Sequence, residues 1–446
     1  MVVLREIKYF IYFIFTLIRQ SIRTRIITCD RTNTIEKNKV PKIVKGDSKS
    51  TSNYIVTSIV TSNGDIIIAR SGGKVFRIST SGIETEILNI PGAEDWRGLW
   101  EDSKGNVFIS PHCTPSLGSI KIEDRGIYKL SPTDYFFRKV YKFYNPQSEI
   151  QTEREKNNDT IWTFCEDEEG AIYAGMYAHT IRYNPSIYKS LDNGETWECI
   201  YNFNTSGLLT KGRHIHGIVY SRVDKSLYCI VGEINDLFKS RDGGHTWISL
   251  GVKCELSKGS ALYAVKDGII IGSDSAYDLV MSKYYFKSRK VKTTSRLSGA
   301  TIFAIRQSDL THRIYAFSKI DSSVKLPSYF PPFSAKDNKI ELLKWLLHSG
   351  VARYNWLLYY LRMYKLFPED AFFPQHNYIL MSDNDGETWQ VIFKDKTTYK
   401  GPNGFWITGY FYKGECLTSY MDASLKFVNP FILYEQETIK TLSRLL

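Results

Sequence analysis

Two histidines separated by a single residue, His214 and His216, are the side chains in this sequence best suited to acid–base chemistry. If their segment is a strand, the alternation of side chains places both imidazoles on the same side. An imidazole can exchange a proton near neutral pH, and it is a common ligand of divalent metals. We therefore predict a polar site around these histidines. It could contact a sugar, hold a metal ion, or simply line a channel.

Two carboxylates follow the histidines, Glu233 and Asp274. A carboxylate pair about 5–10 Å apart can cleave a glycosidic bond. Alternatively, a set of histidine, arginine and tyrosine could abstract the proton next to a uronate carboxylate. The predicted catalytic residues are His214, His216, Glu233 and Asp274. The predicted substrate-binding residues are Arg97, Tyr177, His179 and Arg182. We assign no cofactor, with a divalent metal at the two histidines as the alternative.

A short repeat indicates the elements that would position these side chains. The pattern Ser-x-Asp-x-Gly-x-Thr-Trp occurs at residues 190–197, 240–247 and 382–389, with Asn384 at the Asp position of the third copy. Serine and Asp or Asn side chains bond nearby backbone N–H groups in tight turns, and the glycine permits a positive φ. The tryptophan then begins a strand and buries a large apolar surface. This repeat resembles the Asp box, or BNR repeat, of sialidase-like β-propellers.

A second pattern, Gly-x-(Ile/Val)-(Tyr/Phe)-(Ile/Ala) or a close variant, marks a strand that precedes each box. Its seven instances begin near residues 64, 105, 170, 225, 268, 312 and 414. Such periods, with about four strands each, indicate a β-propeller, because one blade alone cannot bury its faces. We predict an all-β fold, a seven-bladed β-propeller. A six-bladed ring is the alternative, since residues 403–434 carry no box.

Two further segments bear on the resemblance. Phe-Arg-Ile-Ser at residues 76–79 is similar to the Phe/Tyr-Arg-Ile-Pro motif of sialidases, whose arginine binds the substrate carboxylate. It lacks the proline and lies in register with the third strands of the other repeats, so we do not expect sialidase activity. Residues 95–280, with Arg-His-Ile-His-Gly at 213–217, resemble uncharacterised microbial BNR-repeat, glycosyl-hydrolase-like proteins.

The resemblance also implies which face of the ring carries the site. The boxes join third strands to fourth strands, and sialidase-like proteins use the opposite face. On that face we expect five side chains to converge on a central funnel, namely Arg97, His214, His216, Glu233 and Asp274. This implies a carbohydrate-active protein, either a glycoside hydrolase or a polysaccharide lyase, acting on a surface or envelope glycan. The alternative is a non-catalytic propeller that binds glycans or scaffolds protein partners.

The chain divides into four predicted parts. These are a hydrophobic and basic leader helix at residues 1–27, a linker at 28–52, the propeller at 53–434 and a tail at 435–446. Within the propeller, residues 321–376 are predicted to insert a helical hairpin into blade six, because two apolar stretches are broken by Gly350.

The leader and the insertion suggest a membrane partner. The apolar run at residues 7–18 is shorter than the roughly 20 residues that span a bilayer, and arginines follow it. Aromatic side chains flanked by basic ones favour a helix that lies in a membrane interface. A signal sequence and a helix packed on the propeller are the alternatives. We predict membrane association through residues 7–25 and 340–367, with the side of the membrane left open.

Charge and cysteine usage limit the other function classes. The net charge is +11, and residues 1–50 carry eleven Lys or Arg against four Asp or Glu. Because most of the excess lies in the leader, the propeller carries no nucleic-acid signature. The seven cysteines are scattered without a Cys-x-x-Cys motif, which favours reduced thiols over a zinc site or a disulfide framework. Reduced thiols suit an internal compartment, whereas a glycan partner suits the outside.

Overall fold

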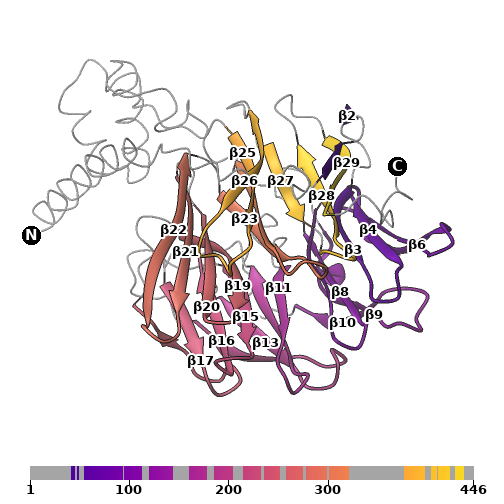
Figure 1. Ribbon diagram of the computed structural model, residues 1–446. Coiled ribbons are helices and arrows are strands. Elements are labelled where there is room, and N and C mark those ends of the chain that lie inside the picture. Colours follow the sequence, from indigo (N-terminus) through magenta and orange to yellow (C-terminus); the bar gives the residue numbers. More distant parts are fainter. Residues whose placement is uncertain are drawn as a thin grey trace, which may run out of the picture.

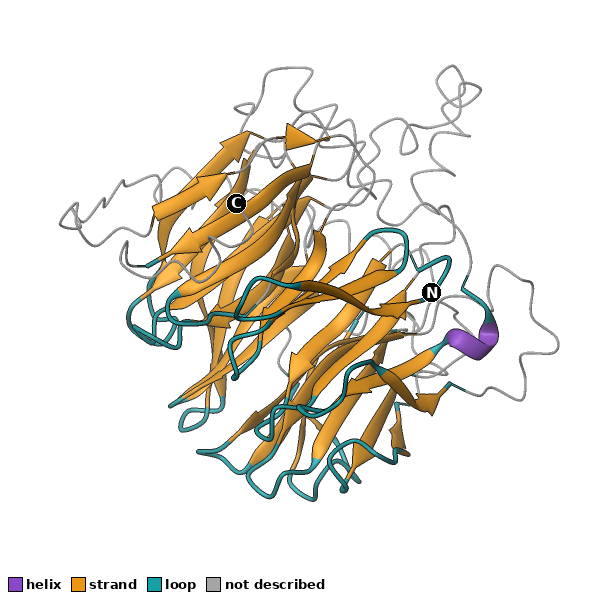
Figure 2. Ribbon diagram, turned by 90° about the vertical axis from the view of Figure 1, so that its right-hand side faces the viewer, coloured by secondary structure: helices purple, strands orange, loops and turns teal. Residues whose placement is uncertain are grey.

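The computed structural model describes antiparallel strands and the turns between them. The described residues are 42–45, 48–49, 55–93, 95–112, 120–143, 160–177, 185–203, 214–232, 236–251, 258–274, 278–298, 301–320, 376–396, 403–408, 410–421 and 427–435. Their one helical segment is a 3-10 turn at Ile122–Asp124, shown in purple in Figure 2. This part of the chain is therefore all-β.

Five sheets of four antiparallel strands follow one another along the chain as blades one to five. Blade one contains β3 (Ile55–Val60), β4 (Ile66–Arg70), β5 (Lys74–Ile78) and β6 (Glu84–Asn89). Blade two contains β7 (Asp95–Glu101), β8 (Val107–His112), β9 (Gly126–Leu130) and β10 (Arg138–Lys142). Blade three contains β11 (Thr160–Glu166), β12 (Ile172–Tyr177), β13 (Ser186–Ser190) and β14 (Glu198–Asn202). Blade four contains β15 (Ile215–Ser221), β16 (Ser226–Val231), β17 (Asp236–Ser240) and β18 (Ile248–Ser249). Blade five contains β19 (Lys258–Val265), β20 (Gly268–Asp274), β21 (Asp278–Tyr285) and β22 (Lys290–Ser298).

The sixth sheet has nine strands. Its strands are β23 (Thr301–Gln307), β24 (Ile314–Ile320), β25 (His376–Ser382), β26 (Gln390–Lys396), β27 (Asn403–Thr408), β28 (Glu415–Met421), β29 (Phe427–Tyr434), β1 (Lys42–Lys45) and β2 (Ser48–Lys49). Strand β24 pairs with β23 and β25, and its last residues, Lys319 and Ile320, pair with Gly404 and Asn403 of β27.

The predicted β-propeller is confirmed, but the prediction of seven blades is wrong, because the described strands form six hydrogen-bonded sheets. The strands expected to make a separate seventh blade, β27 to β29, are hydrogen-bonded to β24 and continue the sixth sheet. The six-bladed alternative agrees with this sheet count. Pairing between β24 and β27 joins segments far apart in sequence, so a count of repeated strands could not reveal it.

The two ends of the described chain meet in the sixth sheet. Strand β1 pairs with β29 from Lys42↔Tyr434 to Lys45↔Phe431, and β2 pairs with the start of β29. Part of the predicted linker at 28–52 therefore forms edge strands. Figure 1 shows the yellow C-terminal strands beside the indigo N-terminal ones, and β28 packs against β3 of blade one. This contact closes the ring.

Apolar clusters join neighbouring blades across the ring. Strand β4 is buried on both faces, with Ile66, Ile67 and Ile68 all nearly inaccessible to solvent. On one face Ile66 packs in a cluster with Leu417 of β28, and on the other Ile67 packs in a cluster with Trp96 of blade two. A continuous run of β-branched residues suits a strand covered on both sides. Each blade is therefore stable only between two neighbours.

Several predicted segments lie outside the described residues. They are the leader helix at 1–27, the insertion at 321–376 apart from its last residue, and the tail at 435–446 apart from its first. That last residue of the insertion, His376, begins strand β25. Among the described residues no helix is both long and apolar enough to cross a membrane.

The repeated Ser-x-Asp-x-Gly-x-Thr-Trp segments form turns between third and fourth strands, as predicted. We call them box turns. In blade three the Gly194 amide donates to Ser190 Oγ at 2.8 Å, and the Thr196 amide donates to Asp192 Oδ1 at 2.9 Å. Gly194 has a φ of 81°, and Trp197 Nε1 donates to the Gly194 carbonyl. Side chains thus satisfy the backbone groups of the turn.

The box turns of blades four and six repeat this geometry. In blade four, Ser240 and Asp242 accept the same backbone bonds at 2.9 Å. In blade six, Asn384 replaces the aspartate, and its Oδ1 still accepts from the Thr388 amide at 3.0 Å. Trp389 differs from its counterparts, because its Nε1 donates to Thr294 of blade five. An amide oxygen therefore performs the same backbone role as a carboxylate in this turn.

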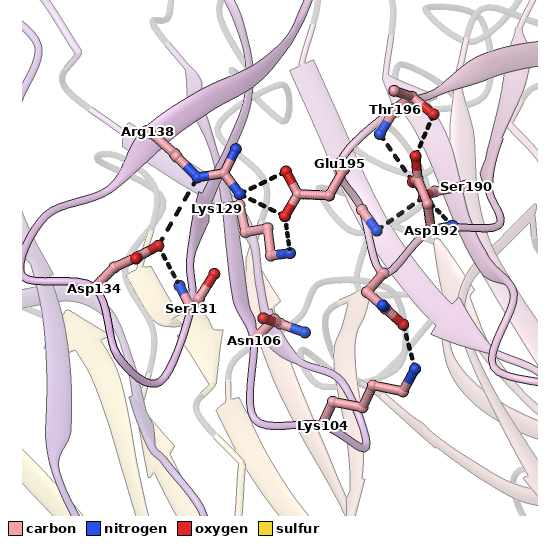
Figure 3. A network of polar contacts seen from close by, with 12 residues as sticks. Lys104, Asn106, Lys129, Ser131, Asp134, Arg138, Ser190, Asp192, Glu195 and Thr196 are labelled. Atoms are coloured by element: carbon pink, nitrogen blue, oxygen red, sulfur yellow. Dashed lines mark hydrogen bonds and ion pairs between the residues drawn. The ribbon is translucent and has the colours of Figure 1, made fainter.

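A box turn also connects its blade to the preceding one. Glu195, in the box turn of blade three, accepts from Lys129 Nζ at 2.6 Å and from Arg138 of blade two (Figure 3). The Lys129 side chain is 3% exposed and that of Glu195 is 42% exposed. The hydrogen bonds from Arg138 and then Lys129 lower the pKa of the Glu195 carboxyl. A lysine buried in the third strand of one blade is thereby compensated by the next blade.

The same connection recurs between blades five and six. Lys283 on β21, whose side chain is 1% exposed, lies 2.8 Å from Glu387 in the box turn of blade six and 2.7 Å from Asp267. The box turn of blade four has His245 at the glutamate position. The buried third-strand lysine of blade four, Lys239, pairs within its own blade, with Asp224 at 2.5 Å. Buried third-strand lysines are thus paired either across the blade boundary or within the blade.

The box-turn geometry predicts how Asp192 responds to substitution and to acid. Burial alone would raise the pKa of Asp192, but the bonds from Thr196 and Ser190 outweigh it and lower that pKa to about 2. Asp192→Asn should preserve stability at neutral pH, as Asn384 does naturally, whereas Asp192→Ala should cost about 1–2 kcal/mol in urea unfolding. Because the folded-state pKa is depressed, this stabilisation is complete above the usual aspartate range. It disappears as the pH falls toward 2, a loss that Asp192→Asn lacks. Equal stability of the Asn and Ala variants would contradict this account.

The connection between Lys129 and Glu195 gives a second prediction. Glu195→Gln should destabilise the protein by about 1–2 kcal/mol, since it weakens the compensation of a buried ammonium while solvent still reaches the glutamate end. Adding Lys129→Met should restore most of the loss, because the charge is then removed as well. Chemical unfolding of the single and double variants measures this coupling. His245→Gln, at the same position of the next box turn, is the matched control and should change little.

Candidate functional site

The first strands of the blades line a central channel. They contact one another around the ring, from β3 through β7, β11, β15 and β19 to β23. The channel contains a cavity of about 100 Å³, lined on the described strands by residues that include Arg97, Trp162, His216, Ser260, Phe303 and Arg306. Thr57 of blade one also lines this cavity, so residues from all six blades border it.

Irregularities in strand pairing place these side chains in the channel. The register of the first and second strands shifts around Trp162 in blade three, His216 in blade four, Ser260 in blade five and Phe303 in blade six. Such a β-bulge leaves one residue unpaired and turns its side chain. All four residues at these shifts line the cavity. The equivalent position of successive blades thus contributes one channel residue each.

The structure brings together five of the eight predicted site residues. Arg97 lies on β7, Tyr177 ends β12, and Asp274 ends β20. His214 bridges to Tyr177 just before β15 begins, and His216 lies on β15. The remaining predicted residues, Glu233, His179 and Arg182, lie outside the described residues. The predicted carboxylate pair is therefore represented by Asp274 alone.

Aromatic and imidazole rings form a continuous stack across two blades, which we call the channel stack. Trp162 and Tyr177 of blade three stack at a centroid distance of 4.3 Å, and Tyr177 stacks on His214 of blade four at 3.8 Å. His214 and His216 follow at 5.6 Å with nearly parallel rings. The Arg97 guanidinium of blade two lies 4.2 Å from the Trp162 centroid. The two histidines do share one side of the strand, as predicted.

His216 has a defined orientation within the channel stack. Its Nδ1 lies 2.9 Å from the Gly259 carbonyl oxygen and 4.0 Å from Asp274 Oδ2. Because a carbonyl can only accept, we assign the proton to Nδ1. The other edge of the ring packs on Gly232, where an added Cβ would lie 2.6 Å from Nε2. The side chain is 10% exposed, so both edges of the imidazole are used within the protein.

Positive charge predominates at this end of the channel. The ammonium of the buried Lys319 lies 4.6 Å from the Phe303 centroid, and the Arg97 guanidinium lies 5.6 Å from the same ring. The opposing carboxylate is Asp274, which is 31% exposed and accepts from Thr301 Oγ1 at 3.3 Å. Cations over aromatic faces are stabilised by the ring quadrupole. Sequence reasoning missed Trp162 and Phe303, although both lie in strand register with Arg97 and His216.

Metal binding and cysteine nucleophilicity are two further chemistries that the residue types in the sequence allow. Among the described residues no three His, Cys, Asp or Glu side chains gather closely enough to hold a metal ion. The described cysteines Cys165, Cys199, Cys229 and Cys416 carry free thiols. Burial raises the pKa of the Cys416 thiol to about 12 and raises the pKa of Cys165 and Cys229 as well. These buried thiols are therefore weak nucleophiles at neutral pH.

Arg77 in the sialidase-like segment has a structural partner. It lies on β5, the third strand of blade one, and its guanidinium is 2.6 Å from Asp65 Oδ2. Asp65 also accepts from the Thr80 amide. The arginine therefore stabilises its own blade, in agreement with the interpretation of residues 76–79 as an ordinary third strand.

The comparisons with known proteins bear on the fold. No protein-family model matches the chain, and no curated protein matches it either. Among solved structures, a streptogramin B lyase matches with a TM-score of 0.52 and 11% identity, covering 89% of this chain and 99% of its own. The WD40 β-propeller domain of Doa1 matches with a TM-score of 0.51 and 8% identity, covering 91% of this chain and 99% of its own. A catalytically inactive virginiamycin B lyase from Staphylococcus aureus with Quinupristin matches at 0.50 and 11%, covering 88% of this chain and 99% of its own. Similarity at these identities shows the propeller fold alone.

The close approach of His216 to Gly232 gives a prediction for the site. Gly232→Ala should force the imidazole out of the channel stack and cost about 1–3 kcal/mol in equilibrium unfolding, because the added Cβ and Nε2 cannot both fit. The double variant Gly232→Ala/His216→Ala is the control. If the ring is the obstacle, Gly232→Ala should add little cost once His216 has been shortened. A full additional cost in the double variant would show that the backbone, rather than the imidazole, rejects the methyl group.

Proposed function

We propose that this protein is a non-catalytic β-propeller that acts as a binding scaffold, with its channel side chains holding the blades together. The channel stack is the observation that carries this proposal. Arg97, Trp162, Tyr177, His214 and His216 contact one another across three blades. Ring stacking contributes about 0.5–1.5 kcal/mol per pair beyond area burial. Side chains predicted to act on a substrate thus have partners within the ring itself.

The size of the channel cavity supports the same proposal. Pockets that enclose a ligand of drug size occupy about 300–1,000 Å³, whereas the channel cavity occupies about 100 Å³. The cavity is therefore small compared with a typical ligand pocket. Binding of a larger partner would take place at the mouth of the channel and on the loops around it.

The orientation of His216 also argues against general-base catalysis in the channel. A base must present its unprotonated nitrogen within hydrogen-bonding distance of the substrate. With the proton on Nδ1, that nitrogen is Nε2, and it packs on the Cα side of Gly232. Gly232 thus lies beside the nitrogen that would have to act as the base.

The proposed binding face is the one opposite the box turns. Near the ends of strands β12, β20 and β24 on this face lie Tyr177, Asp274 and Lys319, which carry a phenol, a carboxylate and an ammonium. These groups suit the hydroxyl and carboxylate groups of glycans, so we propose a glycan as the partner. We also propose membrane association through residues 7–25 and 340–367, which lie outside the described residues.

A glycan-cleaving enzyme is the second candidate. It is favoured by the placement of His216 Nδ1 between the Gly259 carbonyl and Asp274, since catalytic histidines are commonly held by an acceptor at the second nitrogen. The resemblance of the box turns to the Asp boxes of sialidase-like propellers supports it as well. Sialidase itself is not proposed, because the residue 76–79 segment lacks the proline and Arg77 pairs with Asp65.

A glycan array and a polysaccharide-degradation screen distinguish the two candidates. The full-length protein and its His214→Ala and His216→Gln variants would be compared in both assays. We expect saturable glycan binding without turnover by the wild type, and lower melting temperatures for both variants, because each loses contacts of the channel stack.

Turnover of any polysaccharide that His216→Gln abolishes while the fold persists, as judged by circular dichroism, would overturn the scaffold proposal in favour of the enzyme. Lys225→Gln is a suitable control. It removes an exposed cation that pairs with Glu168 far from the channel mouth, and it should affect neither binding nor stability by more than about 0.5 kcal/mol.

A further inference from the structure

We propose that the outer edge of blade five binds an extended acidic segment of a protein partner, which would pair with β22 as a fifth strand. Four exposed cations define this site, Lys287 and Arg289 in the turn before β22 and Lys290 and Lys292 on the strand itself. We call these four residues the basic edge. It lies outside the channel and apart from the proposed glycan-binding face, so it goes beyond the function proposed above.

Strand β22 is a long edge strand. Its nine residues exceed the fourth strand of every other blade, the longest of which is the seven-residue β26. It pairs with β21 on its inner side and ends the strand order of its sheet, at the rim of the ring in Figure 1. Such an edge presents a row of backbone N–H and C=O groups to which an extended peptide can bond. The strand offers roughly 30 Å for this pairing.

The cations of the basic edge are arranged to meet alternate residues of an added strand. Lys290 and Lys292 are two positions apart on β22, so their side chains lie on the same side of the sheet. In the turn before them, the Arg289 amide donates to the Tyr285 carbonyl at 2.9 Å, and Arg289 has a φ of 54°. Asparagine or glycine adopts this conformation with less strain than arginine does. The turn thus keeps a long cation at a position that its backbone does not favour.

An arginine of blade four lies close to the basic edge. Tyr284 of β21 packs against Tyr228 of blade four, with their ring centroids 6.1 Å apart. Burial, and then the Asp224 carboxylate, raise the pKa of Tyr284, whereas Arg289 and Arg241 oppose that rise. Both guanidinium groups therefore lie near one phenol, Arg289 from the turn before β22 and Arg241 from the box turn of blade four. Positive charge thus continues from blade five onto its neighbour.

The carboxylates beside the basic edge serve a buried lysine. Lys283, whose side chain is 1% exposed, lies 2.7 Å from Asp267 and 2.8 Å from Glu387. The hydrogen bond from Lys283, and more weakly the charge of Lys292, lower the pKa of Glu387. Within the described part of the chain, no ion pair shorter than 4 Å joins a residue of the basic edge to a carboxylate. Positive charge therefore exceeds negative charge along this edge.

The fourth strand of blade two shows a different use of cations. On β10, Arg138 lies 2.5 Å from Glu195 of the next blade, and Lys139 Nζ donates to the Glu123 carbonyl. Those two cations hold parts of the ring together. The cations of the basic edge make no such bond among the described residues, and they point to a partner outside the ring.

Edge pairing and charge together select the class of partner. A second copy of β22 would bring lysines opposite lysines, and like charges repel across a strand pair. Anionic lipids and nucleic acids are attracted by cations, but they cannot continue the backbone hydrogen bonds of a sheet. An extended polypeptide with acidic residues at alternate positions satisfies both the backbone groups and the charge. We therefore assign the edge to an acidic protein segment.

Fluorescence anisotropy of a labelled peptide of alternating Glu and Val, as long as β22, tests this proposal on the full-length protein. We expect saturable binding that weakens as salt is added. Lys290→Glu/Lys292→Glu should bind at least about tenfold more weakly, because the charge opposite the peptide is reversed. Lys142→Glu/Lys394→Glu is the matched control, since these exposed lysines lie on β10 and β26 and the net charge changes equally. It should bind within about twofold of the wild type.

Arg289→Asn is a second variant that requires no charge reversal. Asparagine accepts a positive φ, so the midpoint of urea unfolding should not fall. The loss of the guanidinium should nevertheless weaken peptide binding by about threefold or more. A purely structural role of Arg289 predicts the reverse, a change in stability with unchanged binding, and that result would count against the basic edge.

Four further results would overturn the proposal, given circular dichroism spectra that match the wild type. They are no saturable binding up to about 1 mM peptide, equal losses in the two double variants, and equal binding of a peptide whose backbone amides are all N-methylated. The fourth is dimerisation through this edge, or binding to phosphatidylserine vesicles, in the absence of peptide binding. None of these measurements involves glycan binding or turnover, so the basic edge and the proposed function can fail independently.

Discussion

Each sheet in this ring has two apolar faces, and only its neighbours can bury them. Strand β4 illustrates the constraint, because Ile66 and Ile67 face different clusters, one shared with β28 and the other with blade two. No blade can be removed without exposing two such faces, so the ring must close. Closure is achieved by the sixth sheet, where strand β29 pairs with β1 and β2 from the N-terminal side of the chain.

Closing the ring also places polar side chains between the blades and in the channel, where they contact one another. On the box-turn face, Lys129 and Lys283 are buried between blades and are compensated by glutamates of the following box turns. In the channel, β-bulges at equivalent positions turn one residue of the first strand inward in blades three to six. The rings of Trp162, Tyr177 and His214 stack across the boundary between blades three and four. The residues that could act in catalysis thus help to hold neighbouring blades together. For this reason we favour a scaffold over an enzyme.

The sequence was sufficient for the propeller, because it follows from local patterns of turns. It also predicted that His214 and His216 share one side, although the β-bulge at His216 interrupts the alternation on which that prediction was based. It was insufficient where the structure depends on distant pairing. The junction of Lys319 with Gly404 merges the expected seventh blade into the sixth sheet, and β1 lies within a segment expected to be a linker. Trp162 and Phe303 were missed because a β-bulge, which has no sequence signature here, directs them into the channel.

The central claim is that the channel stack binds blades to one another, and a double-mutant cycle between Tyr177 of blade three and His214 of blade four tests it most directly. The free energy of unfolding would be measured for the wild type, Tyr177→Leu, His214→Ala and the double variant. We predict a coupling energy of about 0.5–1.5 kcal/mol, as expected for rings in stacking contact. Additive effects of the two substitutions would contradict the claim, and would leave these side chains available for a role in catalysis.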